Sequence, residues 1–242
     1  GNCTRLLIED GACCGAVISG REVRAGAVVL ATGGASYPLT GSDGSGYALA
    51  RQAGHTVIPP EPSLIPMETE ERWVARAAGL DLRNISMRLT RGGKPVYEDF
   101  GELLFTAYGI GGPTVLSASA HIPEMKPGEY AVEIDLKPAL SEKKLDDRII
   151  RDFAERRGMR FAESLRGLLP AQLAPVIAEL SGIPGDMRVD EVTREQRQQL
   201  GALMKRLTLH IRGFRPIEEA IVTRGGVSVR EIRPNTMESK LC

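Results

Sequence analysis

The chain has 242 residues, of which 42% are apolar and 26% charged, a composition typical of a globular protein with a sizeable core. Lys and Arg total 31 and so do Asp and Glu, so the basic excess expected of a nucleic-acid-binding protein is missing. The apolar runs are too short to cross a bilayer, no signal peptide is recognisable, and the four cysteines and three histidines show no metal-ligand spacing. We therefore expect a cytoplasmic protein with reduced thiols and no metal site.

The first quarter of the chain predicts short strands followed by a helix. Residues 5–9 and 15–19 flank an Asp-Gly turn signal and are typical of a hairpin. Residues 25–31 are Val-rich and apolar on both faces, which predicts a strand buried within a sheet. This strand ends at Gly33-Gly34, and a polar, glycine-rich loop then leads into a helix expected over residues 45–54.

A proline-rich segment from Pro59 to Pro66 separates this region from the next. Proline resists helix and is excluded from central strands, so we predict a linker and a domain boundary near residue 59. Alternating apolar and polar residues over 85–90 and 130–136 predict half-buried strands, and Gly92-Gly93 predicts a hairpin turn. A small antiparallel barrel or sheet is the simplest assembly of these strands.

Residues 141–206 are predicted to be helical. Ser141 is suited to cap the first helix, and Thr193 with Gln196 has the spacing of a capping box. The apolar stripes indicate packing between helices rather than a ligand pocket. This stretch holds 13 basic and 11 acidic residues, which is typical of a mixed, solvated surface. Strands are expected again over residues 207–212, 220–223 and 227–232, the last two separated by a glycine turn.

The glycine pair at the end of the predicted buried strand is the clearest candidate for a ligand site. Open α/β sheets bind ligands at the carboxyl ends of their strands, and the missing Cβ lets a backbone or a flat cofactor approach Gly33 and Gly34. The following helix would present free N–H groups to an anion. A sharp turn without a ligand uses the same residues, so this pattern leaves a purely structural role open. No Ser–His–Asp or Cys–His set is recognisable, and His55, His121 and His210 are expected to be ordinary surface or strand residues.

Five groups of residues, spread over the whole chain and in the family's order, resemble the HI0933-like (BaiN-like) flavoprotein family. They are Ala31-Thr32-Gly33-Gly34; Ser36-Tyr37-Pro38 with Thr40-Gly41-Ser42-Asp43-Gly44; Gly101-Glu102-Leu103-Leu104-Phe105-Thr106 with Gly112-Pro113; Thr223-Arg224-Gly225-Gly226-Val227; and Glu231-Ile232 with Thr236-Met237-Glu238-Ser239-Lys240. The chain departs from the family at Ala107 and Gly111, where a His and a Ser are common.

The resemblance implies an α+β multidomain fold. A partial α/β, Rossmann-like FAD-binding domain (residues 1–58 and 215–242) would be interrupted by an insert (59–214). The insert would be a small antiparallel β-barrel (about 59–140 and 207–214) intertwined with a helical unit (about 141–206). The resemblance also implies an interior piece that lacks the GxGxxG turn for the FAD pyrophosphate and a later FAD-binding segment, so we expect weak or absent FAD binding by the chain alone.

The resemblance further implies which residues lie near the cofactor. Those beside FAD would be Ala31, Thr32, Gly33 and Gly34; those between flavin and insert would be Tyr37, Pro38, Thr40, Gly41 and Asp43; and those in a turn near the isoalloxazine ring would be Gly225, Gly226 and Val227. Alternatives stay open for Tyr37, which would pack over the loop, for Asp43, which would cap the next helix, and for Lys240, which would be a surface lysine.

The implied function is that of a flavin-dependent oxidoreductase acting on a small organic substrate. NAD(P)H is a candidate electron donor, and the missing parts of the FAD domain are the expected partners. No catalytic residue is assigned. The alternative is that the helical insert is a nucleic-acid- or protein-binding module without enzymatic activity.

Overall fold

The computed structural model describes all 242 residues and divides into two compact units. The first unit contains Gly1–Ile65 and Pro216–Cys242, and the second contains Pro66–Arg215. The first boundary between the two units therefore lies between Ile65 and Pro66. It is not near residue 59, because the strand over residues 57–63 pairs with a strand of the first unit.

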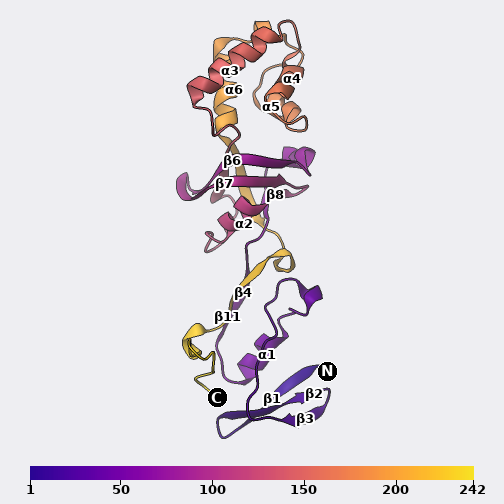
Figure 1. The fold of residues 1–242 in the computed structure, drawn as a ribbon, viewed down its shortest axis with the longest axis vertical. Coiled ribbons are helices and arrows are strands. Elements are labelled where there is room, and N and C mark those ends of the chain that lie inside the picture. Colours follow the sequence, from indigo (N-terminus) through magenta and orange to yellow (C-terminus); the bar gives the residue numbers. More distant parts are fainter. The chain divides into compact units, whose positions relative to one another are not determined.

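The second unit contains a closed barrel of six antiparallel strands in the order β10-β5-β8-β7-β6-β9 (Figure 1). The strands are β5 (Met67–Thr69), β6 (Asp81–Arg91), β7 (Lys94–Phe105), β8 (Gly109–Gly111), β9 (Tyr130–Asp135) and β10 (Leu207–Phe214). In β9, every second residue from Tyr130 to Ile134 is buried, and the residues between them are partly exposed. The antiparallel barrel predicted from this alternation is confirmed.

Helices of the second unit gather at one end of the barrel (Figure 1). They are α3 (Glu142–Glu155), α4 (Phe161–Ser164), α5 (Ala174–Leu180) and α6 (Arg194–Lys205), while α2 (Pro113–Ser119) follows β8. Ser141 caps α3 by accepting a hydrogen bond from Lys144 N, and Thr193 and Gln196 form the predicted capping box. The apolar stripes of α3 and α6 share one core with the barrel, so the prediction that they pack against neighbouring elements is confirmed. None of the helices is both long and apolar enough to span a bilayer.

Glu68 on β5 forms ion pairs with two arginines, Arg212 in β10 and Arg215 just after it. Its carboxylate accepts hydrogen bonds from Arg212 Nη2 at 2.6 Å and Arg215 Nη1 at 2.9 Å. The Arg215 guanidinium also lies over the Tyr108 ring, 4.0 Å from its centroid. The hydrogen bond from Arg212, supported by Arg215, lowers the pKa of the Glu68 carboxyl. The network therefore depends on an ionised Glu68.

Replacing Glu68 by Gln should make the barrel less sensitive to acid. Because folding lowers the pKa of Glu68, its contribution is present above the unfolded value of about 4.3 and is lost as pH falls through the folded value. We expect E68Q to cost about 1 kcal/mol at neutral pH, and the difference from wild type to shrink at lower pH. Trp73, the sole tryptophan, lies in the second unit and reports its unfolding by fluorescence. A pH-independent difference would contradict the prediction.

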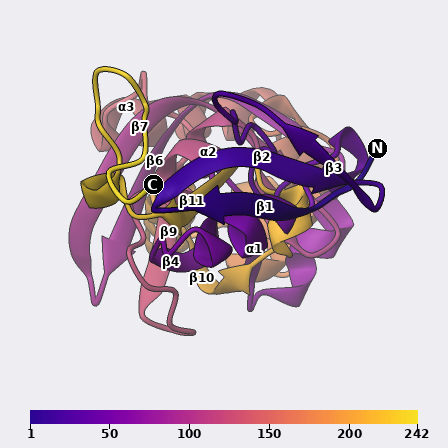
Figure 2. The same ribbon diagram turned by 90° about the horizontal axis from the view of Figure 1, so that it is seen from below.

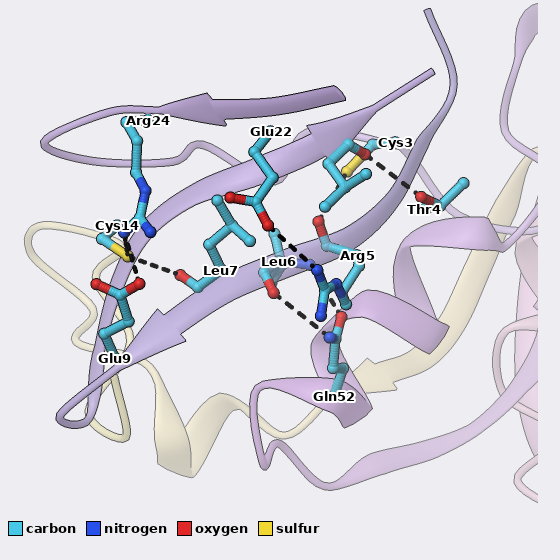
Figure 3. Close-up of polar contacts among 11 residues, drawn as sticks. Cys3, Thr4, Arg5, Leu6, Leu7, Glu9, Cys14, Glu22, Arg24 and Gln52 are labelled. Carbon is cyan, nitrogen blue, oxygen red and sulfur yellow. Dashed lines mark hydrogen bonds and ion pairs between the residues drawn. The ribbon is translucent and has the colours of Figure 1, made fainter. Parts of the chain in front are cut away.

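The first unit contains a three-stranded antiparallel sheet of β1 (Cys3–Glu9), β2 (Ala12–Ile18) and β3 (Arg21–Arg24), with α1 (Ser45–Gln52) beside β1 (Figure 2). The Gln52 side chain accepts from Leu6 N at 2.9 Å and donates to Leu6 O at 3.4 Å, so it takes the place of a neighbouring strand at this point (Figure 3). Leu6 and Ala16 pack with Leu49 of α1 in a small core. The hairpin and the helix predicted for this region are confirmed.

The buried strand predicted over residues 25–31 does not form in this chain. These residues have no regular secondary structure, and the side chains of Val29 and Leu30 are 87% and 40% exposed. A strand that is apolar on both faces needs neighbours that pair with it and cover it. No other strand of the chain pairs with this segment, so the prediction is wrong for the chain as it stands.

The proline-rich segment is a strand rather than a linker. β4 (Val57–Ser63) pairs with β11 (Val222–Val227) in a two-stranded ribbon, whose outer edges tolerate prolines without an N–H. The register shifts between Arg224 and Gly226, and Gly225 has φ +84°. The predicted glycine turn is therefore a bulge inside one strand, and residues 229–231 form a 3₁₀ turn rather than a strand.

Candidate functional site

Two of the predicted cofactor segments, far apart in sequence, meet at the N-terminus of α1. Gly44 N donates to Gly34 O at 3.0 Å, which closes the loop between them. Thr223 on β11 then joins this loop, since its Oγ1 accepts from Ala35 N at 2.9 Å and Ser36 N at 3.1 Å. We call residues 31–47 and 223–227 together the glycine-rich site.

Side chains of the protein occupy the space beside Gly33 and Gly34. A Cβ at Gly33 would lie 2.4 Å from Ser42 Oγ, and a Cβ at Gly34 would lie 2.6 Å from Thr223 Oγ1. Both glycines are therefore required by close internal packing, which is the structural role left open by the sequence. The N–H groups of Ala35 and Ser36 are also taken by Thr223 rather than presented to an anion.

Tyr47 of α1 is the central side chain of the glycine-rich site. A Cβ at Gly226 would lie 3.1 Å from its Cε1, and a Cβ at Gly44 would lie 3.5 Å from its Cδ2. Its hydroxyl would lie 3.5 Å from a Cβ at Gly34. Glycines from three parts of the chain thus surround one aromatic ring. Neither Tyr47 nor the contact of Thr223 with the loop was foreseen from the sequence.

The residues expected between flavin and insert form a compact 3₁₀ turn over Pro38–Thr40. Thr40 Oγ1 donates to Tyr37 O at 2.7 Å, and Gly41 N donates to Pro38 O at 3.0 Å. Tyr37 has φ +51° and is half exposed.

Asp43 is not the N-cap of α1: that position is Gly44, which forms no side-chain cap hydrogen bond, and Asp43 lies one residue before it. Its Oδ1 accepts from Ser45 N at 2.9 Å in the first turn of α1, where a negative charge is favoured. Hydrogen bonds from Ser45 lower the pKa of the Asp43 carboxyl. Among the other predicted residues, Ala31 is exposed, Thr32 packs against Gly46 of α1, and Val227 pairs with Val57 in the ribbon.

The structure assembles a Ser–His–Glu set that the sequence did not reveal. His55 is buried, with Nδ1 3.1 Å from Glu231 Oε2 and Nε2 2.9 Å from Ser239 Oγ. Hydrogen bonds from Thr56, followed by the effect of His55, lower the pKa of the Glu231 carboxyl. Ser239 Oγ also accepts from two backbone N–H groups at the C-terminus, which makes it a turn cap. The expectation that His55 is an ordinary surface or strand residue is wrong, because it fastens the C-terminal segment within the first unit.

The other two histidines and Lys240 each contact one or two neighbouring groups and belong to no such set. His121 stacks on Tyr97 with ring centroids 4.3 Å apart, and His210 is an exposed strand residue paired with Glu71. Lys240 is exposed, and its Nζ donates to Arg230 O at 2.7 Å.

The glycine-rich site does not by itself fit a flavin. Its residues line neither of two cavities of the chain, one beside β1 and Gln52 and one at the barrel edge. The backbone groups and glycine faces that would serve a cofactor are filled by Ser42, Tyr47 and Thr223. The glycine-rich site is therefore a well-packed surface region and not a closed pocket. The exposed apolar residues Val29 and Leu30 lie next to it in the sequence.

Curated proteins similar to the chain include two kinds of enzyme. The 3-dehydro-bile acid delta(4,6)-reductase of Clostridium scindens is 33% identical over 223 residues, covering 91% of this chain and 54% of that protein. The ribosomal RNA dihydrouridine synthases of Haemophilus influenzae and Escherichia coli are 32% and 28% identical, covering 88% and 92% of this chain and 50% and 53% of those proteins. The chain thus spans about half the length of these relatives.

The profile of the HI0933-like protein barrel and H2TH domain matches residues 61–222. These residues include the whole closed barrel and all four helices at its end. The chain belongs to the HI0933-like family.

Proposed function

We propose that the protein containing this chain is an FAD-dependent oxidoreductase that reduces a carbon–carbon double bond of a small organic substrate. The observation that carries the proposal is the membership of the HI0933-like family together with 33% identity to a named reductase. The convergence of residues 31–47 and 223–227 supports it, because the family resemblance assigns both segments to the cofactor. NAD(P)H is the electron donor that we propose.

The names of the relatives support this reaction class. A delta(4,6)-reductase acts on ring double bonds, and a dihydrouridine synthase forms uridine with a saturated 5,6 bond. In both, the double bond is conjugated with a carbonyl group, which stabilises the negative charge that hydride addition leaves. The shared chemistry favours a conjugated carbonyl compound as substrate of this protein.

The flavin supplies the electron pair when bound, so the role left to the residues of this chain is to position it. They would do so by fixing the loop over residues 33–36. Thr223 and Tyr47 hold residues 33–36 against α1 and so set the path of the exposed segment before them. The exposure of Val29 and Leu30 supports a larger cofactor domain in which further segments of the same protein cover them. Those segments would complete the FAD site.

Purification of the 242-residue chain and of the complete protein that contains it would test this function. We expect the complete protein to be yellow, to release FAD on denaturation, and to oxidise NADH or NADPH when a conjugated enone is added. The isolated chain should bind FAD more weakly than micromolar. A colourless complete protein that takes up no flavin would contradict the proposal, and micromolar binding by the chain alone would contradict the need for further segments.

A nucleic acid is a second candidate substrate, because two relatives are named for ribosomal RNA. The helical unit carries little net positive charge for it, since its 13 basic residues are nearly balanced by 11 acidic ones, some of them in ion pairs such as Arg148 with Asp152 and Arg197 with Asp146. RNA binding by this surface would weaken steeply with added salt. Such binding, together with reduction of uridine in RNA, would favour this candidate over a free small molecule.

A further inference from the structure

The buried ring of His55 joins the end of α1 to the C-terminal segment over residues 231–242. The residue is 8% exposed, and its backbone N–H donates to Ala50 O at 3.0 Å. Its Nδ1 lies 3.1 Å from Glu231 Oε2, and its Nε2 lies 2.9 Å from Ser239 Oγ. Both ring nitrogens thus contact this segment, and the way in which the ring holds it depends on which nitrogens carry hydrogen.

The surroundings of Ser239 show which ring nitrogen carries the hydrogen. Ser239 Oγ accepts from Leu241 N at 3.0 Å and from Cys242 N at 3.1 Å. A hydroxyl has two lone pairs and one hydrogen, so with both lone pairs occupied it can only donate. The acceptor within reach is His55 Nε2, because Cys242 Sγ lies 3.8 Å away and forms only weak hydrogen bonds. Nε2 therefore carries no hydrogen, and Nδ1 donates its own to Glu231.

Glu231 holds the other side of the ring. Its Oε2 also accepts from Thr56 N at 2.8 Å, and it is the charged side chain that pairs with His55. Hydrogen bonds from Thr56, followed by the effect of His55, lower the pKa of the Glu231 carboxyl. Glu231 therefore stays ionised over the pH range in which histidines titrate.

No second charged group pairs with the ring. The other charged residues of α1, β4 and the segment after β11 are all exposed, and none forms an ion pair with His55 or Glu231: Arg51, Glu61, Arg230, Arg233, Glu238 and Lys240. A second proton on His55 would leave the hydrogen bond between Nδ1 and Glu231 in place. On the opposite side it would place an N–H group against an oxygen that already accepts from two others.

We propose that His55 is a pH-dependent clasp, which holds the turn over residues 239–242 when the ring is neutral and loosens it when the ring is protonated. In the protonated state, three N–H groups compete for the two lone pairs of Ser239 Oγ, so at least one of the three hydrogen bonds is lost. The contact with Glu231 persists in both states, so only the end of the segment is released. The inference goes beyond the proposed function, because it concerns the C-terminal segment and holds whether or not FAD binds.

The clasp differs from the Ser–His–Glu set of a hydrolase, although the hydroxyl donates in the same direction. A nucleophilic oxygen attacks with a lone pair, and N–H groups of its own turn occupy both lone pairs of Ser239 Oγ. We therefore expect that a fluorophosphonate, which labels activated serines, leaves Ser239 unmodified at neutral pH. Labelling of Ser239 would contradict the arrangement of hydrogens on which the clasp depends.

Nitrogen-15 NMR of the histidine rings in the 242-residue chain tests the clasp without a mutation, and His55→Gln identifies the signals of His55. At neutral pH we expect a protonated, pyrrole-type signal for Nδ1 and an unprotonated, pyridine-type signal for Nε2. As the pH falls and Nε2 becomes protonated, the amide signal of Leu241 or Cys242 should shift with the same midpoint. The opposite tautomer, a doubly protonated ring at neutral pH, or amides that do not follow the ring would overturn the proposal.

Ser239→Ala separates the clasp from other effects of acid on the end of the chain. It removes the acceptor of both amides, so the Leu241 and Cys242 signals should already be shifted at neutral pH and should no longer follow the ring. Ser228→Ala is the matched control, because Ser228 contacts Thr56 through its backbone N–H, which the substitution keeps. The control should respond to pH as wild type does. Amides that still follow the ring in Ser239→Ala would show that acid reaches the segment by another route, and the clasp would be wrong.

Discussion

Gly46→Ala should destabilise the first unit by about 2–3 kcal/mol, although Gly→Ala inside a helix is normally stabilising. Gly46 is buried in α1, and a Cβ there would lie 1.9 Å from Thr32 Oγ1 and 2.9 Å from Thr32 Cβ. Thr32 Oγ1 can rotate about the Cα–Cβ bond, but Thr32 Cβ cannot move away without displacing the backbone of the loop that leads to Gly33 and Gly34. The substitution should therefore disturb α1 and the glycine-rich site together.

Hydrogen exchange of the α1 amides measures this effect within the first unit. The matched control is Gly201→Ala in α6, where the nearest atom to a new Cβ is Ile149 Cδ1 at 4.0 Å. That substitution should stabilise the second unit by about 0.5–1 kcal/mol, as helix propensity predicts. Adding Thr32→Ala to Gly46→Ala should recover part of the loss, because it removes Oγ1 and Cγ2 of residue 32 but keeps the Cβ. Stabilisation by both glycine substitutions would show that the contact with Thr32 yields easily.

Elements defined by neighbouring residues could be predicted from the sequence. The cap at Ser141 and the capping box at Thr193 depend on residues three positions apart, and the alternation of β9 depends on every second residue. The barrel follows from several such strands, because half-buried strands must share one core. These predictions are confirmed because their causes lie within a few residues of each other.

Predictions that depended on distant pairing partners failed. Residues 25–31 have the composition of a buried strand, but composition does not supply the neighbours that such a strand needs. The prolines of β4 indicated a linker because each removes an N–H from a sheet. They are accommodated because β11, about 160 residues later in the chain, pairs with β4 in a narrow ribbon whose bulge at Gly225 fits the Pro59 carbonyl.

The glycine-rich site depends both on local motifs, which could be predicted, and on distant partners, which could not. The motifs located the segments that meet at α1, but the reason for each glycine became clear only from its distant neighbour, as for Gly34 with Thr223 and Gly226 with Tyr47. His55 gave no signal at all, because its partners Glu231 and Ser239 are 176 and 184 residues away. Sequence patterns therefore identify which segments matter, and tertiary contacts decide what each residue does there.

Thr223→Val should release the loop over residues 33–36 and cost the first unit about 2–3 kcal/mol. The substitution keeps the side-chain shape and suits a strand, so β11 itself should persist. It removes the oxygen that accepts from Ala35 N and Ser36 N, and each partly buried N–H left without an acceptor costs about 1 kcal/mol or more. Faster hydrogen exchange at these two amides is the direct measurement.

Thr223→Ser is the control that separates the hydroxyl from the methyl group. It keeps the acceptor and should preserve slow exchange at Ala35 and Ser36, with only a small loss of packing. In the complete protein, Thr223→Val should also weaken FAD binding, whereas Thr223→Ser should not, because the loop path depends on the oxygen. Unchanged exchange in Thr223→Val would mean that the loop holds its shape without Thr223, and the convergence of the two segments would then have no bearing on cofactor binding.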